Sequence, residues 1–202
     1  EGNYLSIGNY NGVYNQTITA GVNLTNGDEV AGLQMDIPLD DNFTYAEGTI
    51  ALTDRASANH VIYAGMISNH VLRVIVYSMP STPFIGTTGE IFTFGLTLGT
   101  ESGIFPLPIE NAIISDVNGN SLPVETSNGS VTVVEPEMFE ITATTVPNAA
   151  AVIEGVGIHA EQSTATLTAI ANPGYEFVNW TENGEVISTE ETISFVVLSD
   201  QI

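Results

Sequence analysis

The chain has 202 residues, 43% of them hydrophobic, which is enough for one large or two ordinary domains with a real core. It carries 24 acidic residues against two cations, Arg55 and Arg73, and this net charge of −22 excludes non-specific binding to nucleic acid or to an anionic membrane. The absence of cysteine excludes disulfides, zinc–thiolate sites and thiol nucleophiles, and no apolar run approaches the roughly 20 residues of a membrane-spanning helix.

Alternating apolar residues predict a series of short strands in the first part of the chain. Apolar side chains occupy every second position in residues 16–24 and again in residues 33–39. Turn-forming residues end both segments, at 26–28 and at 40–42. Further strands are expected at 43–52 and 61–68. Since no helical period is sustained over ten residues, the pattern predicts an all-β unit.

The longest apolar pattern, in residues 71–98, predicts two strands joined by a loop. In the first, Leu72, Val74 and Val76 point to one side of the strand and Arg73, Ile75 and Tyr77 to the other. In the second, four apolar residues share one face: Phe92, Phe94, Leu96 and Leu98. Two prolines and two glycines in the loop rule out a bridging helix. A sheet face this apolar has to be covered by a second sheet, which predicts a β-sandwich.

Residues 99–134 continue the strand pattern. Two prolines, Pro106 and Pro108, mark the segment 105–109 as an edge strand or an irregular one. Residues 116–120, with the sequence DVNGN, predict a hairpin turn, and residues 130–134 form the last strand of this unit.

Three segments in this order resemble the cohesin family over residues 4–134: GLQMDIPLDD, VLRVIVYSMPSTPFIGTTGEIFTFGLTL and GIFPLPIENAIISDVNGNSLPVETSNGSVTV. The most specific part is the last, in which a D-x-N-G-N turn is followed by N-G-S-V-T-V. The resemblance implies a nine-stranded jelly-roll β-sandwich of the kind that cohesins and carbohydrate-binding modules share. It also implies a non-catalytic receptor for calcium-loaded dockerin modules in exported bacterial assemblies. Related sandwiches bind polysaccharide instead.

The character of the chain changes after a short linker, predicted at 135–138. Residues 139–202 predict a small second β-rich domain, with turns at Asn172-Pro173-Gly174 and Asn183-Gly184. The segment ANPGYEFVNWTENGEVISTEETISFVV resembles the internalin-B-type bacterial repeat of extracellular proteins. In that family another strand follows, so we expect the domain to be truncated at its C-terminus.

Candidate sites for chemistry have simpler structural interpretations. The three histidines, His60, His70 and His159, come without a G-x-S-x-G nucleophile motif, and acidic pairs such as Asp40-Asp41 fall in turns. Residues 155–160 match G-x-G-x-x-A, but a strand pattern follows where a dinucleotide site needs a helix. Residues 116–120 lack the glycine spacing of an EF-hand loop. The sequence therefore predicts neither an enzyme nor a cofactor or metal site, with Ca²⁺ entering only through a partner or the acidic surface.

Three aromatic residues of the second domain, Tyr175, Phe177 and Trp180, allow two interpretations. They could form a platform for stacking a sugar ring, or they could fill the core of a domain that needs large side chains to bury enough area. Their position in a patterned strand favours the core.

The family resemblance, in which the dockerin rests on one flat sheet face, leads to a binding-face hypothesis. The matched strands place on that face Gln34, Asp36, Arg73, Ile75 and Tyr77. Tyrosine and arginine at an exposed centre are good interface anchors, although Arg73 could instead balance nearby acids, and Gly32 adds no polar contact. We therefore expect a secreted or cell-surface module for protein binding or adhesion, with a dockerin-like partner and the repeat domain as spacer. The alternative is a carbohydrate-binding module of a secreted polysaccharide-processing protein.

Overall fold

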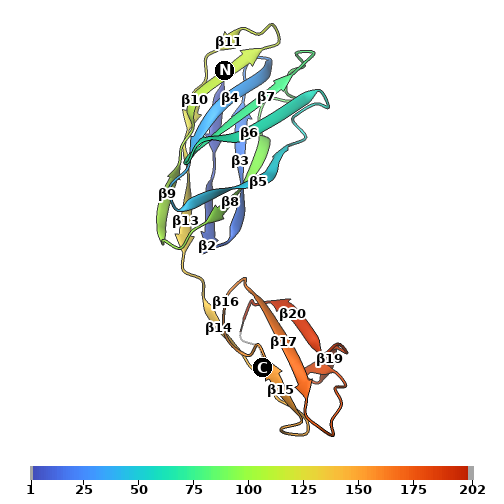
Figure 1. Ribbon diagram of the computed structural model, residues 1–202. Helices are drawn as coiled ribbons and strands as arrows, with labels where there is room; N and C mark the ends of the chain where they lie inside the picture. Colours follow the sequence, from blue (N-terminus) through green and yellow to red (C-terminus); the bar gives the residue numbers. More distant parts are fainter. Residues whose placement is uncertain (1, 200–202) are drawn as a thin grey trace. The chain divides into compact units, whose positions relative to one another are not determined.

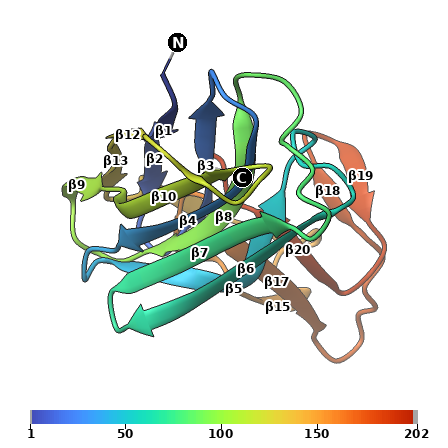
Figure 2. The ribbon, with the colours of Figure 1, turned by 90° about the horizontal axis from the view of Figure 1, so that it is seen from above.

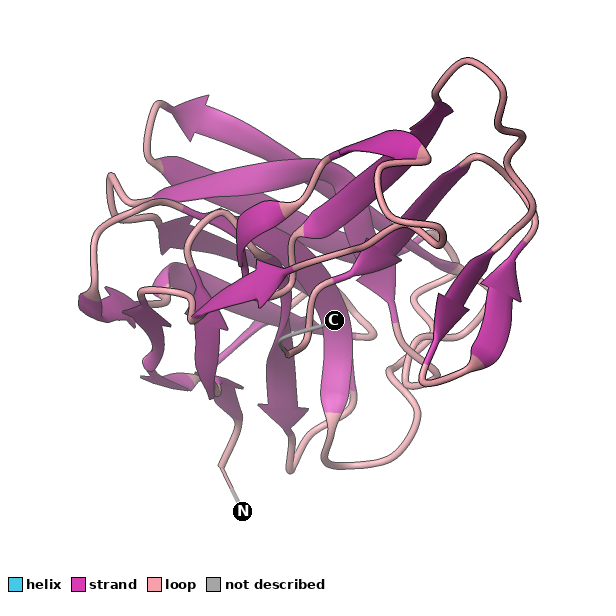
Figure 3. Ribbon diagram, turned by 90° about the horizontal axis from the view of Figure 1, so that it is seen from below, coloured by secondary structure: helices cyan, strands magenta, loops and turns pink. Residues whose placement is uncertain are grey.

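The computed structural model describes residues 2–199, and within them every regular element is a β-strand (Figure 3). No helix long and apolar enough to cross a membrane occurs among these residues. The chain divides into two compact units, unit 1 (Glu1–Glu135) and unit 2 (Pro136–Ile202). The division falls inside the segment 135–138, for which the sequence predicts a linker.

Unit 1 is a sandwich of two five-stranded sheets (Figure 1). The first, called the β8 sheet, contains in spatial order β12 (Glu125–Ser127), β1 (Tyr4–Ile7), β3 (Thr17–Thr25), β8 (Glu90–Leu98) and β5 (Phe43–Leu52). The second, called the β7 sheet, contains β11 (Ser121–Leu122), β10 (Glu110–Asp116), β4 (Val30–Pro38), β7 (Val71–Ser78) and β6 (His60–Ser68). A third sheet joins β2 (Asn9–Val13), β13 (Gly129–Val134) and β9 (Gly103–Leu107).

The thirteen strands of unit 1 reduce to the nine of the predicted jelly roll. Only Gly8 separates β1 from β2, and only residues 108–109 separate β9 from β10, so each pair is one strand interrupted where it changes sheet. The other two strands beyond the predicted nine are the short β11 and β12, which lie on either side of Pro123. As predicted, the proline-containing strand β9 lies at the edge of its sheet.

The core lies between the two large sheets and confirms the predicted alternation. On β7 the side chains of Leu72, Val74 and Val76 are at most 1% exposed, whereas the intervening residues are partly exposed. The predicted apolar face of β8 is buried to the same degree. Full burial of each such side chain contributes about 1.5–3 kcal/mol, so the two strands account for much of the stability of the sandwich.

Unit 2 is built from three small sheets around a core of six buried residues: Ile141, Ala165, Leu167, Ala169, Trp180 and Val197. The strand pairs are β14 (Met138–Ile141) with β16 (Gly157–Ala160), and β18 (Trp180–Glu182) with β19 (Glu185–Ser188). The three-stranded sheet has the order β15 (Ala151–Glu154), β17 (Thr164–Ala171), β20 (Thr192–Val196).

Three sequence-based expectations for unit 2 can be compared with the structure. Trp180 is 8% exposed and packs against Phe177, which supports the core interpretation. The expected strand around Tyr175 is wrong, because residues 175–179 have no strand partner and only Trp180 enters β18. Residues 155–160 lead from β15 into β16 and are followed by the strand β17, as the strand pattern predicts, whereas a dinucleotide fingerprint is followed by a helix.

Gly155 is required by the close approach of β17 and not only by its backbone conformation. Its φ is +90°, and a Cβ atom there would lie 1.9 Å from the backbone oxygen of Thr166. We expect Gly155→Ala to lower the free energy of unfolding of unit 2 by about 2 kcal/mol or more. Gly157→Ala is the matched control, since Gly157 also has a positive φ but would place its Cβ in open space. Equal losses for both variants in chemical denaturation would contradict the steric explanation.

Candidate protein-binding face

The structure brings the five predicted face residues together on the outer surface of the β7 sheet. Strands β4 and β7 are neighbours, and their antiparallel register sets Gln34 opposite Ile75 and Asp36 opposite Arg73. Tyr77 follows two positions along β7 on the same side. Figure 2 shows β10, β4, β7 and β6 side by side in this order, so the face extends over four strands.

Asp36 is not available to a partner, which corrects the expectation of an outward polar contact. It is 2% exposed, and its carboxylate accepts hydrogen bonds from Arg73 Nε at 2.7 Å and Arg73 Nη2 at 2.8 Å. The side-chain amide of Asn111 donates a third bond, at 2.8 Å. The bond from Arg73 is the main cause that holds the pKa of Asp36 below its usual range.

Arg73 therefore has two roles that the sequence leaves open as alternatives. It balances Asp36, and this pairing raises its own pKa. Its side chain is nevertheless 37% exposed, so part of it still faces solvent. A bidentate pair fixes the arginine in one orientation before any partner arrives, and this reduces the entropy lost on binding.

Three further residues belong to this face and are missing from the sequence-based prediction. Val61 and Tyr63 on β6 lie opposite Tyr77 and Ile75, and Ile113 on β10 lies opposite Gln34. Tyr63 and Ile113 are 59% and 52% exposed, and the Tyr63 ring lies nearly parallel to that of Tyr77, with centroids 6.1 Å apart. The neighbouring Tyr63 hydroxyl raises the pKa of Tyr77.

A shallow hollow beside Gly32 lies among the side chains of β4, β7 and β10. The hollow has a volume of about 220 Å³. Its lining includes the polar Gln34 and the apolar or aromatic Ile75, Tyr77 and Ile113. A hollow of this size admits one apolar side chain. We call the following set the Tyr77 face: Gly32, Gln34, Val61, Tyr63, Arg73, Ile75, Tyr77 and Ile113.

The histidines have structural surroundings. His60 is buried and stacks on Phe84 with ring centroids 4.4 Å apart, its Nδ1 accepts the backbone N–H of Ser57, and burial lowers its pKa. His70 lies 3.3 Å from the exposed Asp41. Within residues 2–199 no group of three or more histidine and acidic side chains has the geometry to hold a metal ion.

The DVNGN segment is a turn, as the sequence predicts. Asp116 Oδ1 accepts the backbone N–H groups of Asn118 and Asn120, each at 2.8 Å, and these bonds close the hairpin between β10 and β11. The bonds from Asn120 are the main cause of the lowered pKa of Asp116. The Asp116 carboxylate therefore accepts its hydrogen bonds from residues of its own turn.

Unit 2 contains a larger cavity, of about 780 Å³. Its walls include Ile141, Leu167, Phe177, Trp180 and Phe195, which are mostly members of the small core or packed against it. The indole N–H of Trp180 is buried and has no hydrogen-bond partner among the described residues.

Comparisons with known proteins agree with this architecture. Residues 141–201 match the family model described as the divergent InlB B-repeat domain. The chain matches no curated protein in sequence. Unit 1 is similar to a non-cellulosomal cohesin from the archaeon Archaeoglobus fulgidus, with 17% identity and a TM-score of 0.58 over 67% of this chain and 93% of that one.

Two further similar structures are cohesins solved in complexes with dockerins. One is a type I complex from Clostridium thermocellum, with 18% identity and a TM-score of 0.58 over 66% of this chain and 100% of that one. The other is the sixth cohesin of scaffoldin B from Acetivibrio cellulolyticus, with 16% identity and a TM-score of 0.57 over 66% of this chain and 100% of that one. The chain thus combines a cohesin-like β-sandwich with a C-terminal divergent InlB B-repeat domain.

Proposed function

We propose that unit 1 is a non-catalytic module that binds a protein partner of the dockerin kind through the Tyr77 face. The observation that carries the proposal is the cluster of Tyr63, Tyr77 and Ile113 beside a pre-oriented Arg73 on one sheet face, where Tyr63 and Ile113 are exposed and Tyr77 is half-buried. The fold supports it, because similar sandwiches have been solved with dockerins bound.

The composition of the face suits a protein interface. Aromatic residues and arginine are enriched among the side chains that dominate binding energy, and they work best surrounded by contacts that exclude water. Here Tyr77 and Ile75 occupy the centre of the Tyr77 face. Gln34 supplies a polar group that fixes the position of the partner on this face. The hollow lined by Gly32, Gln34, Ile75, Tyr77 and Ile113 offers a socket for one side chain of the partner.

The charge of the chain shapes the choice of partner. A net charge of −22 repels acidic proteins at long range and accelerates encounter with cationic ones. A dockerin-like module that carries its own Ca²⁺ meets this requirement, and so the metal would enter the complex with the partner.

One observation favours the carbohydrate alternative. The nearly parallel rings of Tyr63 and Tyr77 lie together on an exposed sheet face, and aromatic faces of this kind stack on sugar rings. The rest of the Tyr77 face, which is aliphatic apart from Gln34 and the paired Arg73, offers few hydrogen-bond partners for hydroxyl groups. We therefore place protein binding first.

We further propose that the protein acts outside the cell or at the bacterial surface, with unit 2 as a spacer. Cohesins and InlB B-repeats are typically extracellular modules, and unit 1 resembles the former in fold while unit 2 matches the latter in sequence. In this arrangement the repeat domain holds the binding unit away from its point of attachment.

Replacing Tyr77 by alanine tests the proposal. We expect the variant to lose about tenfold or more in affinity for the partner, because the partly exposed Tyr77 lies at the centre of the face, and to change its thermal midpoint by only a few degrees. The full chain is used to capture proteins from secreted and envelope fractions, with Ca²⁺ and with chelator. Ile104→Ala is the matched control, because Ile104 is 74% exposed on β9, in a different sheet.

The outcomes separate the two candidate functions. A protein retained by the wild type and by Ile104→Ala in Ca²⁺, and lost with Tyr77→Ala, supports a dockerin-like partner. If no protein is retained and polysaccharide gels retard the chain instead, the carbohydrate function replaces the protein-binding one.

A further inference from the structure

The edges of the two large sheets in unit 1 differ in how well they are protected. Edge strands β11 and β12 have only two and three residues, too few to template another strand. The edge strand β5 is longer, but its ladder is broken between Ala46 and Ala51, where Gly48 has a φ of +76° and Glu47 adds a charge. Short length, bulges and charges are the usual protections of a sheet edge.

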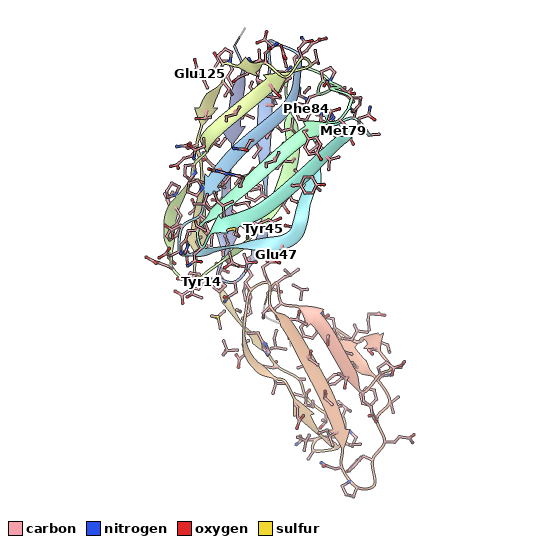
Figure 4. The ribbon with its side chains drawn as sticks, turned by 45° about the horizontal axis from the view of Figure 1, so that its top comes forward. Tyr14, Tyr45, Glu47, Met79, Phe84 and Glu125 are labelled. Carbon is pink, nitrogen blue, oxygen red and sulfur yellow. The ribbon has the colours of Figure 1, made fainter. Side chains whose placement is uncertain are left out.

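Strand β6 has none of these protections along most of its length. It is nine residues long, pairs only with β7, and keeps a regular register from His60 to Met66. No Asp, Glu, Lys or Arg occurs anywhere in residues 59–72, in a chain with 24 acids. In Figure 4, Met79 and Phe84 mark one end of β7, the strand that pairs with β6. Tyr45 and Glu47 on β5 lie toward the other end of β7.

We propose that two copies of this chain associate by antiparallel pairing of β6 with β6 about a twofold axis at Ala64. This pairing joins the β7 sheets of the two copies into one continuous sheet. It satisfies backbone groups that face solvent in the monomer and uses the only long unprotected edge of that sheet, so the assembly closes as a dimer and does not extend into a fibre.

The sequence of β6 fits a second copy of itself in this register. Pairing about Ala64 sets Ile62 opposite Met66 and Tyr63 opposite Gly65 in both halves of the dimer. Tyr63 is 59% exposed, and the space above Gly65 is empty, with no atom within 4 Å of where its Cβ would be. An aromatic ring that lies across a strand glycine fills such a gap and stabilises the pair.

The charge distribution also favours the β6 edge as the surface through which two copies of the chain approach each other. Two chains of net charge −22 repel each other, and the repulsion is smallest where a surface carries no charged side chain of its own. The association should therefore strengthen with ionic strength, which screens the remaining surface. This inference does not rest on the proposed function, because it is argued from the backbone edge and the sequence of β6, although Tyr63 also belongs to the Tyr77 face.

Sedimentation equilibrium of the full chain at low and high salt tests the dimer. We expect a monomer–dimer equilibrium that shifts toward dimer in high salt, and a loss of about tenfold or more in the association constant for Gly65→Glu. In the monomer this side chain enters open space, so the variant should keep its thermal midpoint. Ile104→Glu makes the same charge change on β9 and should dimerise as the wild type does.

Cysteine pairing tests the register, because the chain has no native cysteine. A mixture of Tyr63→Cys and Gly65→Cys chains should form a disulfide-linked heterodimer, while each variant alone should remain largely uncrosslinked. Three results would overturn the proposal. The wild-type chain could stay monomeric in high salt, or the Gly65→Glu variant could dimerise as the wild type does. The third is crosslinking that is no greater in the mixture than in the separate variants.

Discussion

Arg55→Met is expected to lower the free energy of unfolding of unit 1 by about 3 kcal/mol, because it removes a group of charge-assisted hydrogen bonds to backbone. The guanidinium of Arg55 pairs with no carboxylate among the described residues and donates instead to the following acceptors: the carbonyl oxygens of Leu24, Ile85, Gly86 and Gly89, and Asn26 Oδ1. These bonds tie the end of β3 to the loop between β7 and β8. Without them several carbonyl groups lose their partners.

Denaturant unfolding of the full chain measures this effect, with Arg55→Lys as the matched variant. Lysine keeps the charge but has one compact ammonium group in place of the planar guanidinium, whose donors point to several carbonyls at once. We therefore expect Arg55→Lys to recover less than half of the free energy of unfolding that Arg55→Met loses. The slope of the transition should stay the same, since the compactness of the folded state is not changed. A loss below about 1 kcal/mol for Arg55→Met would show that the loop is held in place by its apolar contacts, such as Phe84.

Arg73→Leu should destabilise unit 1 in a pH-dependent manner and lower its thermal midpoint by several degrees at neutral pH. It leaves the buried carboxylate of Asp36 with Asn111 as its remaining hydrogen-bond donor. In the wild type the pKa of Asp36 is lowered, so the pair contributes fully above the ordinary carboxyl pKa. That contribution is lost as the pH falls through the folded-state pKa.

The stability gap between the wild type and Arg73→Leu should therefore be widest near neutrality and should narrow in acid, which thermal denaturation at a series of pH values will show. The double variant Asp36→Leu/Arg73→Leu provides the control, because it removes both charges and should recover most of the neutral-pH loss. A gap that stays constant across the pH series would mean that Arg73 stabilises the sheet by packing and not through Asp36.

The apolar pattern predicts the sandwich because the side-chain period of a strand is a local property. Leu72, Val74 and Val76 are buried, and Arg73, Ile75 and Tyr77 lie on the other side, simply because successive residues of a strand point to opposite faces. The same reasoning fails at residues 175–179, where aromatic residues alternate but the chain has no partner strand.

The parts of the Tyr77 face that sequence reasoning missed depend on strand order. Tyr63 and Ile113 join the face only because β6 and β10 flank β7 and β4, and spacing along the chain does not carry this information. Asn111, which donates a hydrogen bond to the buried Asp36, lies where the register of β10 is irregular between Glu110 and Ile113, and the sequence gives no sign of this irregularity. The role of Arg55 is hidden because most of its partners are backbone carbonyls, which every residue has.

Hydrogen–deuterium exchange of the full chain, alone and with the captured partner, tests whether the Tyr77 face is the binding surface. We expect slower exchange on the four strands of the Tyr77 face when the partner is bound, with the largest change at residues 73–77 of β7 and 32–36 of β4. Exchange in the strands of the β8 sheet should not change. Protection that appears on the β8 sheet or in unit 2, with the Tyr77 face unchanged, would contradict the proposed binding surface.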